Sequence, residues 1–124
     1  MMEKMLAGRR VLVVEDEMLI LMLIEGMLSD LGCESVTAAA TEDQALALIA
    51  AQEFDAAMLD MNLNGNMSSA VANALDARGV PFIFSTGYTG QGVEGRSGDR
   101  DRPVLRKPFR HEDLAATLGT LLSR

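Results

Sequence analysis

The sequence is poor in the residues that build disulfides and zinc sites. Its 124 residues include a single cysteine, Cys33, and a single histidine, His111. One cysteine cannot form a disulfide within the chain, and one cysteine with one histidine cannot supply the four ligands of a structural zinc site. We therefore expect a protein of a reducing compartment, the cytoplasm, whose fold depends on an apolar core.

Long apolar runs and an excess of positive charge are also missing. The most hydrophobic run covers only residues 18–24, whereas a membrane-spanning helix needs about 20 apolar residues, so we expect no membrane insertion. The chain carries 11 Lys and Arg against 18 Asp and Glu, a formal net charge of −7. Because binding to a phosphate backbone requires clustered cations, we expect no nucleic acid among its partners.

The composition that remains is that of one folded domain. Apolar residues make up 48% of the chain and the mean hydropathy is +0.13, which excludes an intrinsically disordered chain. Domains cluster at about 100–150 residues. We therefore expect residues 1–124 to form a single domain with a core of about 10–122, and no second domain.

Short apolar segments alternate with helical patterns along the chain. The segments typical of strands are residues 11–14, 34–38, 55–60, 81–86 and 104–106. The helical patterns are residues 16–31, a segment that starts at Thr41, residues 68–77 and a segment from about residue 110. This alternation predicts βαβ units, right-handed crossovers and a parallel sheet. Five strands favour a flavodoxin-like, doubly wound α/β/α fold, (βα)5.

The first helical pattern predicts one buried and one exposed face. The stripe expected to face the sheet consists of Ile20, Leu23, Ile24, Met27 and Leu31, and Gly32 is expected to end the helix. Met18, Met22, Glu25 and Ser29 are expected on the opposite side, with Leu21 at its flank. The apolar residues Met18, Leu21 and Met22 form a candidate docking surface for a partner helix.

One stretch interrupts the alternation. Five of the twelve residues in 87–98 are glycine, and apolar periodicity is nearly absent there. We expect the fourth helix, which belongs in this stretch, to be short or mobile.

Polar residues stand where the predicted strands end. Glu15 and Asp16 follow the first strand, Asp60 ends the third, Thr86 ends the fourth and Lys107 follows the fifth. In a doubly wound sheet these ends lie at one edge, where ligands bind. Gathered carboxylates repel one another unless a cation lies between them, and oxygen ligands of this kind suit Mg²⁺. An ammonium group and a hydroxyl suit phosphoryl oxygens, so the set predicts phosphoryl transfer to a carboxylate.

These motifs, in this order, resemble the receiver domain of bacterial two-component response regulators. The matching pieces are residues 13–17, residues 58–65, Thr86 and the triplet Lys107-Pro108-Phe109. The resemblance implies that Asp60 accepts a phosphoryl group from a sensor histidine kinase or a histidine phosphotransfer protein. It also implies a Mg²⁺ site made of Glu15, Asp16, Asp60 and the backbone carbonyl of Asn62.

The resemblance further implies contact between Lys107 and the phosphoryl group, and movement of Thr86 toward that group. The signal would pass to an unknown downstream protein, in the manner of a stand-alone regulator or a phosphorelay member. The docking surface on the first helix would receive a helix of the kinase. On this interpretation the chain is a phosphoacceptor and not an enzyme that turns over a separate substrate.

The fourth strand and the position three residues before Lys107 differ from the common pattern. Residues 81–88 are similar to the receiver subgroup called FATGUY, with Ser85 where that motif usually has alanine. Val104 stands where many receivers have a switching aromatic residue. We therefore expect Tyr88 and the glycine-rich segment to carry the conformational signal.

Three other functions compete with this interpretation. A phosphatase of the haloacid dehalogenase type needs a second acid two residues after the nucleophile, but Asn62 occupies that position, and an amide cannot act as a general acid. A flavin or nucleotide carrier needs a glycine-rich loop after the first strand, where this chain has acids. A degenerate receiver that binds partners without phosphorylation remains the main alternative.

Overall fold

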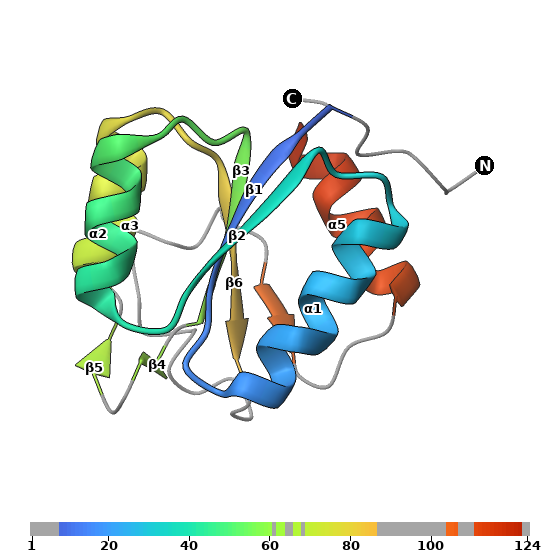
Figure 1. Cartoon of the computed structure of the whole chain (residues 1–124), viewed down its shortest axis with the longest axis horizontal. Coiled ribbons are helices and arrows are strands. Elements are labelled where there is room, and N and C mark those ends of the chain that lie inside the picture. The colour runs from blue at the N-terminus through green and yellow to red at the C-terminus, as the bar shows by residue number, and fades with distance from the viewer. Residues whose placement is uncertain are drawn as a thin grey trace.

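The computed structural model describes residues 8–60, 62–63, 66–67, 69–86, 104–106 and 111–122. For residues 62–63, 66–67, 86, 104–106 and 111 only the backbone is described. A five-stranded parallel sheet stands between two layers of helices (Figure 1). The predicted doubly wound α/β/α fold is confirmed. No helix in the described part of the chain is long and apolar enough to cross a membrane.

The strands of the sheet lie in the order β2-β1-β3-β6-β7, and every neighbouring pair is parallel. Their bounds are β1 Arg10–Val14, β2 Ser35–Ala39, β3 Ala56–Asp60, β6 Phe82–Thr86 and β7 Val104–Arg106. Each bound lies within one residue of the predicted segment. The central strand β3 is buried along its whole length, as its continuous apolar run predicts for a strand covered on both faces.

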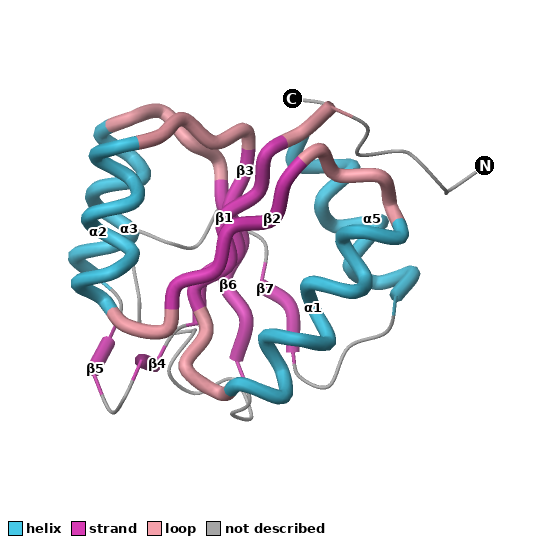
Figure 2. Tube along the Cα trace, in the orientation of Figure 1, coloured by secondary structure: helices cyan, strands magenta, loops and turns pink. Residues whose placement is uncertain are grey.

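The helices cover the sheet in two pairs. Helices α1 (Met18–Asp30) and α5 (His111–Leu122) lie on one face, and α2 (Glu42–Ala51) and α3 (Ser69–Ala77) lie on the other (Figure 2). Strand side chains alternate between the two resulting cores. Along β3, Met58 packs with α1 and α5, whereas its neighbour Leu59 packs with α2 and α3.

The predicted orientation of α1 was wrong in two respects. Leu21 is buried, with 5% of its surface exposed, so it does not belong to an exposed docking surface. Leu23, predicted to face the sheet, is 58% exposed. The buried residues are Leu21, Ile24 and Leu28. Apolar side chains surround the first two turns of α1, so their spacing does not distinguish one face from the other, and contact with the sheet decides which face is buried.

The end of α1 agrees with the predicted stop. Gly32 has a φ of 91°, a left-handed conformation that glycine adopts without steric cost. Its N–H donates to the carbonyl of Ser29 (3.0 Å), and the N–H of Cys33 donates to the carbonyl of Leu28 (3.3 Å). This pair of hydrogen bonds satisfies the last carbonyl groups of the helix, and the chain then turns directly into β2.

Two elements bear on the surroundings of the site. Strands β4 (Asn62–Leu63) and β5 (Asn66–Met67) form a short antiparallel pair directly after β3, where the sequence predicted only a loop. The predicted fourth helix, in residues 87–98, lies outside the described residues.

Candidate metal and phosphoryl site

Glu15 is held at the carboxyl end of β1 by two hydrogen bonds. Its backbone N–H donates to the carbonyl of Ala39 at 3.0 Å, which extends the pairing of β1 with β2 by one residue. Its Oε2 atom accepts from the N–H of Glu17, the N-cap residue of α1, at 3.1 Å. The side chain is 1% exposed. A carboxylate at this position accepts a hydrogen bond from a backbone N–H at the start of the helix. The same hydrogen bond fixes the orientation of the carboxylate.

Asp60 is placed by the alternation of side chains in the sheet. It is the last residue of β3, is 5% exposed, and pairs in register with Ser85 of β6. Because Met58, two residues earlier, faces the side of α1 and α5, Asp60 faces that side as well. The same argument applies to Glu15, which follows Val13 by two residues.

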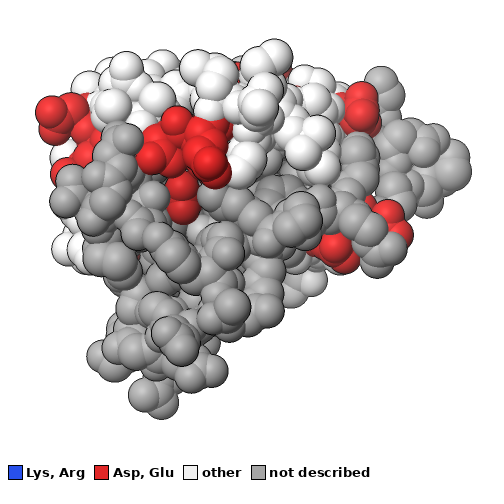
Figure 3. Space-filling view, turned by 90° about the horizontal axis from the view of Figure 1, so that it is seen from below, with Lys and Arg blue, Asp and Glu red and all other residues white. Residues whose placement is uncertain are grey.

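Carboxylate oxygens of Glu15, Asp16 and Asp60 all lie within 4.8 Å of one another. We call these three residues the acidic cluster. Glu15 and Asp60 are buried and Asp16 is half-buried. Seen from the carboxyl edge of the sheet, acidic side chains gather on the surface, and no Lys or Arg of the described residues is visible (Figure 3). The predicted meeting of these three residues at one edge is confirmed.

The donor set of the acidic cluster fits Mg²⁺. Three carboxylates at this separation repel one another, and a divalent cation compensates their charge. Mg²⁺ prefers oxygen ligands and is bound by one or two carboxylates together with water and phosphate oxygens. The half-buried Asp16 leaves one side of the cluster open to such ligands. Glu15, Asp16 and Asp60 would hold the ion.

The family model of the response regulator receiver domain matches residues 11–119. The chain belongs to this family. Its fold and its acidic cluster are therefore those of a receiver domain. No curated protein matches the sequence.

Solved structures similar to this receiver domain include three informative ones. SdrG from Sphingomonas melonis Fr1 is 44% identical, with a TM-score of 0.81, over 93% of this chain and 97% of that one. PhyR from Brucella abortus, a response regulator, is 31% identical, with a TM-score of 0.81, over 97% of this chain and 50% of that one. The receiver domain of the sensor histidine kinase PA1611 from Pseudomonas aeruginosa PAO1 is 29% identical, with a TM-score of 0.83, over 95% of this chain and all of that one. That structure contains magnesium coordinated in the active-site cleft.

Other predicted site residues of the receiver domain are placed only in part. The backbone of Asn62 lies in β4, two residues after Asp60. The backbone of Thr86 ends β6 and pairs with Arg106 of β7. Lys107 and Tyr88 lie outside the described residues. Their roles, like the assignment to the FATGUY subgroup, stay predictions.

Ser85 is a neighbour of the acidic cluster that the sequence did not single out as a site residue. It is 2% exposed, and in the register of β3 with β6 it stands directly beside Asp60. In the FATGUY motif Ser85 stands out only because alanine usually occupies its position. Its place beside Asp60 follows from the register of β3 with β6, which becomes known once the two strands are paired in the structure.

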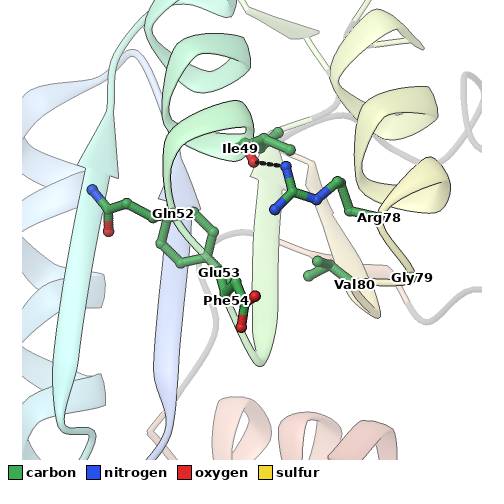
Figure 4. A pocket seen from close by; sticks show the side chains of 7 residues that line it. All are labelled: Ile49, Gln52, Glu53, Phe54, Arg78, Gly79 and Val80. Atoms are coloured by element: carbon green, nitrogen blue, oxygen red, sulfur yellow. Dashed lines mark hydrogen bonds between the residues drawn. The ribbon is translucent and has the colours of Figure 1, made fainter.

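A hollow lies at the opposite edge of the sheet, where β3 and β6 begin. It has a volume of about 270 Å³ and is lined by Ile49, Gln52, Glu53, Phe54, Arg78, Gly79 and Val80 (Figure 4). One guanidinium nitrogen of Arg78 donates to the backbone carbonyl of Ile49 at 2.7 Å, which joins the end of α3 to the end of α2. A strand length separates this hollow from the acidic cluster, so it is not part of the candidate site.

Proposed function

We propose that this receiver domain is a phosphoacceptor in which Asp60 takes a phosphoryl group from a histidine of a sensor kinase or of a phosphotransfer protein. The observation that carries the proposal is the convergence of three carboxylates, two of them buried, within 4.8 Å at the carboxyl edge of the sheet. Burial of charged carboxylates costs free energy unless a cation or hydrogen bonds compensate their charge. A Mg²⁺ ion held by Glu15, Asp16 and Asp60 would supply that compensation and would attract the oxygens of a phosphoryl group.

The proposed reaction is a direct displacement at phosphorus. A carboxylate oxygen of Asp60 attacks the phosphorus atom of the phosphohistidine. The new P–O bond forms as the P–N bond breaks, and the imidazole nitrogen leaves with the bonding electron pair. Mg²⁺, when bound, neutralises the charge on the phosphoryl oxygens. Glu15 and Asp16 would hold the ion in position, and the hydrogen bond donated by the backbone N–H of Glu17 fixes the side chain of Glu15.

The remaining roles in this proposal belong to residues matched by the family resemblance. The Asn62 carbonyl completes the metal site, Lys107 contacts the phosphoryl group, and Thr86 together with Tyr88 responds to it. The kinase or phosphotransfer protein docks on α1, where Met18 and Met22 are 61% and 58% exposed. The product is the phosphorylated receiver itself, which binds a downstream protein. No separate substrate is turned over.

A second candidate is an interaction module that works without phosphorylation. Val104 favours it, because this position of β7 lacks the aromatic side chain that many receivers use to respond to phosphorylation. The two candidates differ in whether Asp60 reacts.

The test is incubation with acetyl phosphate and Mg²⁺, followed by intact-mass measurement. The wild type should gain the mass of one phosphoryl group, and neither Asp60→Asn nor the wild type in EDTA should gain it. Asp43→Asn removes a charge from an exposed position of α2 and should react like the wild type. A wild type that stays unmodified contradicts the phosphoacceptor function and favours the interaction module.

A further inference from the structure

The buried polar side chains of the described residues stand next to one another at the carboxyl edge of the sheet. They are Glu15, Asp60 and Ser85, with exposed fractions of 1%, 5% and 2%. Asp60 pairs in register with Ser85, and the register that joins Val14 to Leu59 brings Glu15 beside Asp60. Glu15 and Asp60 belong to the acidic cluster. Ser85 is the buried neighbour whose presence the metal site does not explain.

The side chain of Ser85 lies on the same face of the sheet as that of Asp60. Ile83, two residues before Ser85, packs with α1 and α5, as does Met58, two residues before Asp60. Because strand side chains alternate, Ser85 and Asp60 both face that side. Neighbouring strands lie about 4.8 Å apart, and the serine hydroxyl rotates to suit its partner. The hydroxyl can therefore reach a carboxylate oxygen of Asp60.

Ser85 differs from the other members of this group because it is a hydrogen-bond donor. The ionised carboxylates of Glu15 and Asp16 can only accept hydrogen bonds, whereas the Ser85 hydroxyl can donate one to Asp60. A hydrogen bond to an ionised carboxylate is about twice as strong as one to a neutral oxygen. A donor at this place therefore stabilises the free carboxylate of Asp60 more than the acyl phosphate that the same side chain would form.

We propose that the Ser85 hydroxyl donates a hydrogen bond to Asp60 and thereby shortens the lifetime of the phosphoryl group on it. The inference rests on the proposed function, because it concerns the acyl phosphate formed there. In its hydrolysis a water oxygen attacks phosphorus and gives a proton to the solvent. The P–O bond to Asp60 breaks, and the carboxylate leaves with the bonding electron pair. Negative charge grows on Asp60 in this step, and the Ser85 donor stabilises that charge.

The lifetime of the phosphoryl group tests the role of the hydroxyl. The whole chain is phosphorylated with acetyl phosphate and Mg²⁺, freed from the reagent, and followed by intact mass over time. Ser85→Ala should keep the phosphoryl group about three- to tenfold longer than the wild type. Ser85→Cys has nearly the shape of serine but is a weak donor, so it should behave like Ser85→Ala. Ser35→Ala makes the same change at an exposed position of β2 and should leave the lifetime unchanged. A lifetime of Ser85→Ala that equals or falls below that of the wild type overturns the proposal, as does a wild-type lifetime in Ser85→Cys.

An infrared measurement reports the hydrogen bond itself. Incorporation of aspartate labelled with ¹³C at its side-chain carboxyl group identifies the carbonyl band of phosphorylated Asp60 in the difference spectrum. A carbonyl that accepts a hydrogen bond absorbs at lower frequency than one that does not. The band should therefore move to higher frequency in Ser85→Ala and in Ser85→Cys, and stay in place in Ser35→Ala. A purely structural role of Ser85 would not produce this selective shift. The same band frequency in the wild type and Ser85→Ala overturns the proposal.

The outcome is separable from that of the proposed function. Ser85→Ala should react with acetyl phosphate at least as fast as the wild type, because the attack consumes the charge that the hydroxyl stabilises. If the wild type gains a phosphoryl group and loses it at the same rate as Ser85→Ala, the phosphoacceptor function stands and the role of Ser85 fails alone. If neither protein gains a phosphoryl group, the phosphoacceptor function fails and the role of Ser85 fails with it.

Discussion

Replacement of Asp60 by asparagine should stabilise the domain in the absence of Mg²⁺. The change removes one charge from the acidic cluster and keeps the size of the side chain. Two unit charges 4.8 Å apart repel by about 0.9 kcal/mol in a dielectric of 80 and about 3.5 kcal/mol in one of 20. Because Asp60 and Glu15 are buried, we expect the free energy of unfolding to rise by about 1–3 kcal/mol.

Mg²⁺ should reverse the order of stability, so that the wild type becomes more stable than Asp60→Asn. A ligand that binds only the folded state stabilises it by about 2.7 kcal/mol at a concentration of 100 times its Kd. The wild type gains this free energy, whereas the asparagine variant has lost one of its three carboxylates and gains less. Thermal unfolding in EDTA and in excess Mg²⁺, followed by circular dichroism, measures both effects. For a chain of 124 residues, 1 kcal/mol corresponds to a shift in Tm of about 4 °C.

Asp55→Asn is the matched control, because the same chemical change should lower the free energy of unfolding instead of raising it. Asp55 lies at the other edge of the sheet, where its Oδ2 atom accepts from the backbone N–H of Arg10 at 2.8 Å and lies 3.6 Å from Nε of Arg10. Loss of this charge should destabilise the domain by about 1 kcal/mol, with the response to Mg²⁺ retained. The reasoning is refuted if Asp60→Asn destabilises the domain in EDTA, or if Mg²⁺ raises the Tm of that variant as much as that of the wild type.

Three further predictions concern the fold. Leu28→Ala leaves a cavity at a fully buried site under α1 and should lower the free energy of unfolding, measured in urea, by about 2–4 kcal/mol. A decrease below about 1 kcal/mol would contradict the buried face described for α1. Thr41→Ala removes the hydroxyl that accepts from the N–H of Gln44 at 3.1 Å and should cost about 1 kcal/mol, with Thr41→Asp retaining the wild-type value. Burial raises the pKa of the Cys33 thiol, so at a given pH the folded protein holds less thiolate. The pH at which the alkylation rate of Cys33 rises should therefore be higher in the folded protein than in the urea-unfolded chain. Identical pH profiles of the two states would contradict the raised pKa.

Much of the fold was predictable because the strands are short apolar runs between helical patterns. The β-branched run at 11–14 and the run at 55–60 favour strands buried on both faces, and both are central in the sheet. The acidic cluster followed from one topological rule, since the carboxyl ends of parallel strands share an edge. The sequence alone therefore places Glu15, Asp16 and Asp60 together.

The remaining features depend on contacts that a linear pattern does not contain. The buried face of α1 was assigned wrongly at Leu21 and Leu23 because the helix is apolar on almost every side, and only its seat against the sheet selects the stripe. The place of Ser85 beside Asp60 depends on the register of two strands that are far apart in the sequence. The pairing of β4 with β5 involves two residues on each side, too few to produce a periodic signal.

The complete burial of β3 limits how this domain can respond to a ligand at Asp60. Each residue of the strand is covered, and its two faces belong to separate apolar cores. A shift of the strand would disturb close packing on both sides at once, and cores of this kind resist gradual deformation. The backbone that carries Asp60 therefore acts as a fixed reference, and any structural response must arise in groups that move relative to it at the rim of the sheet.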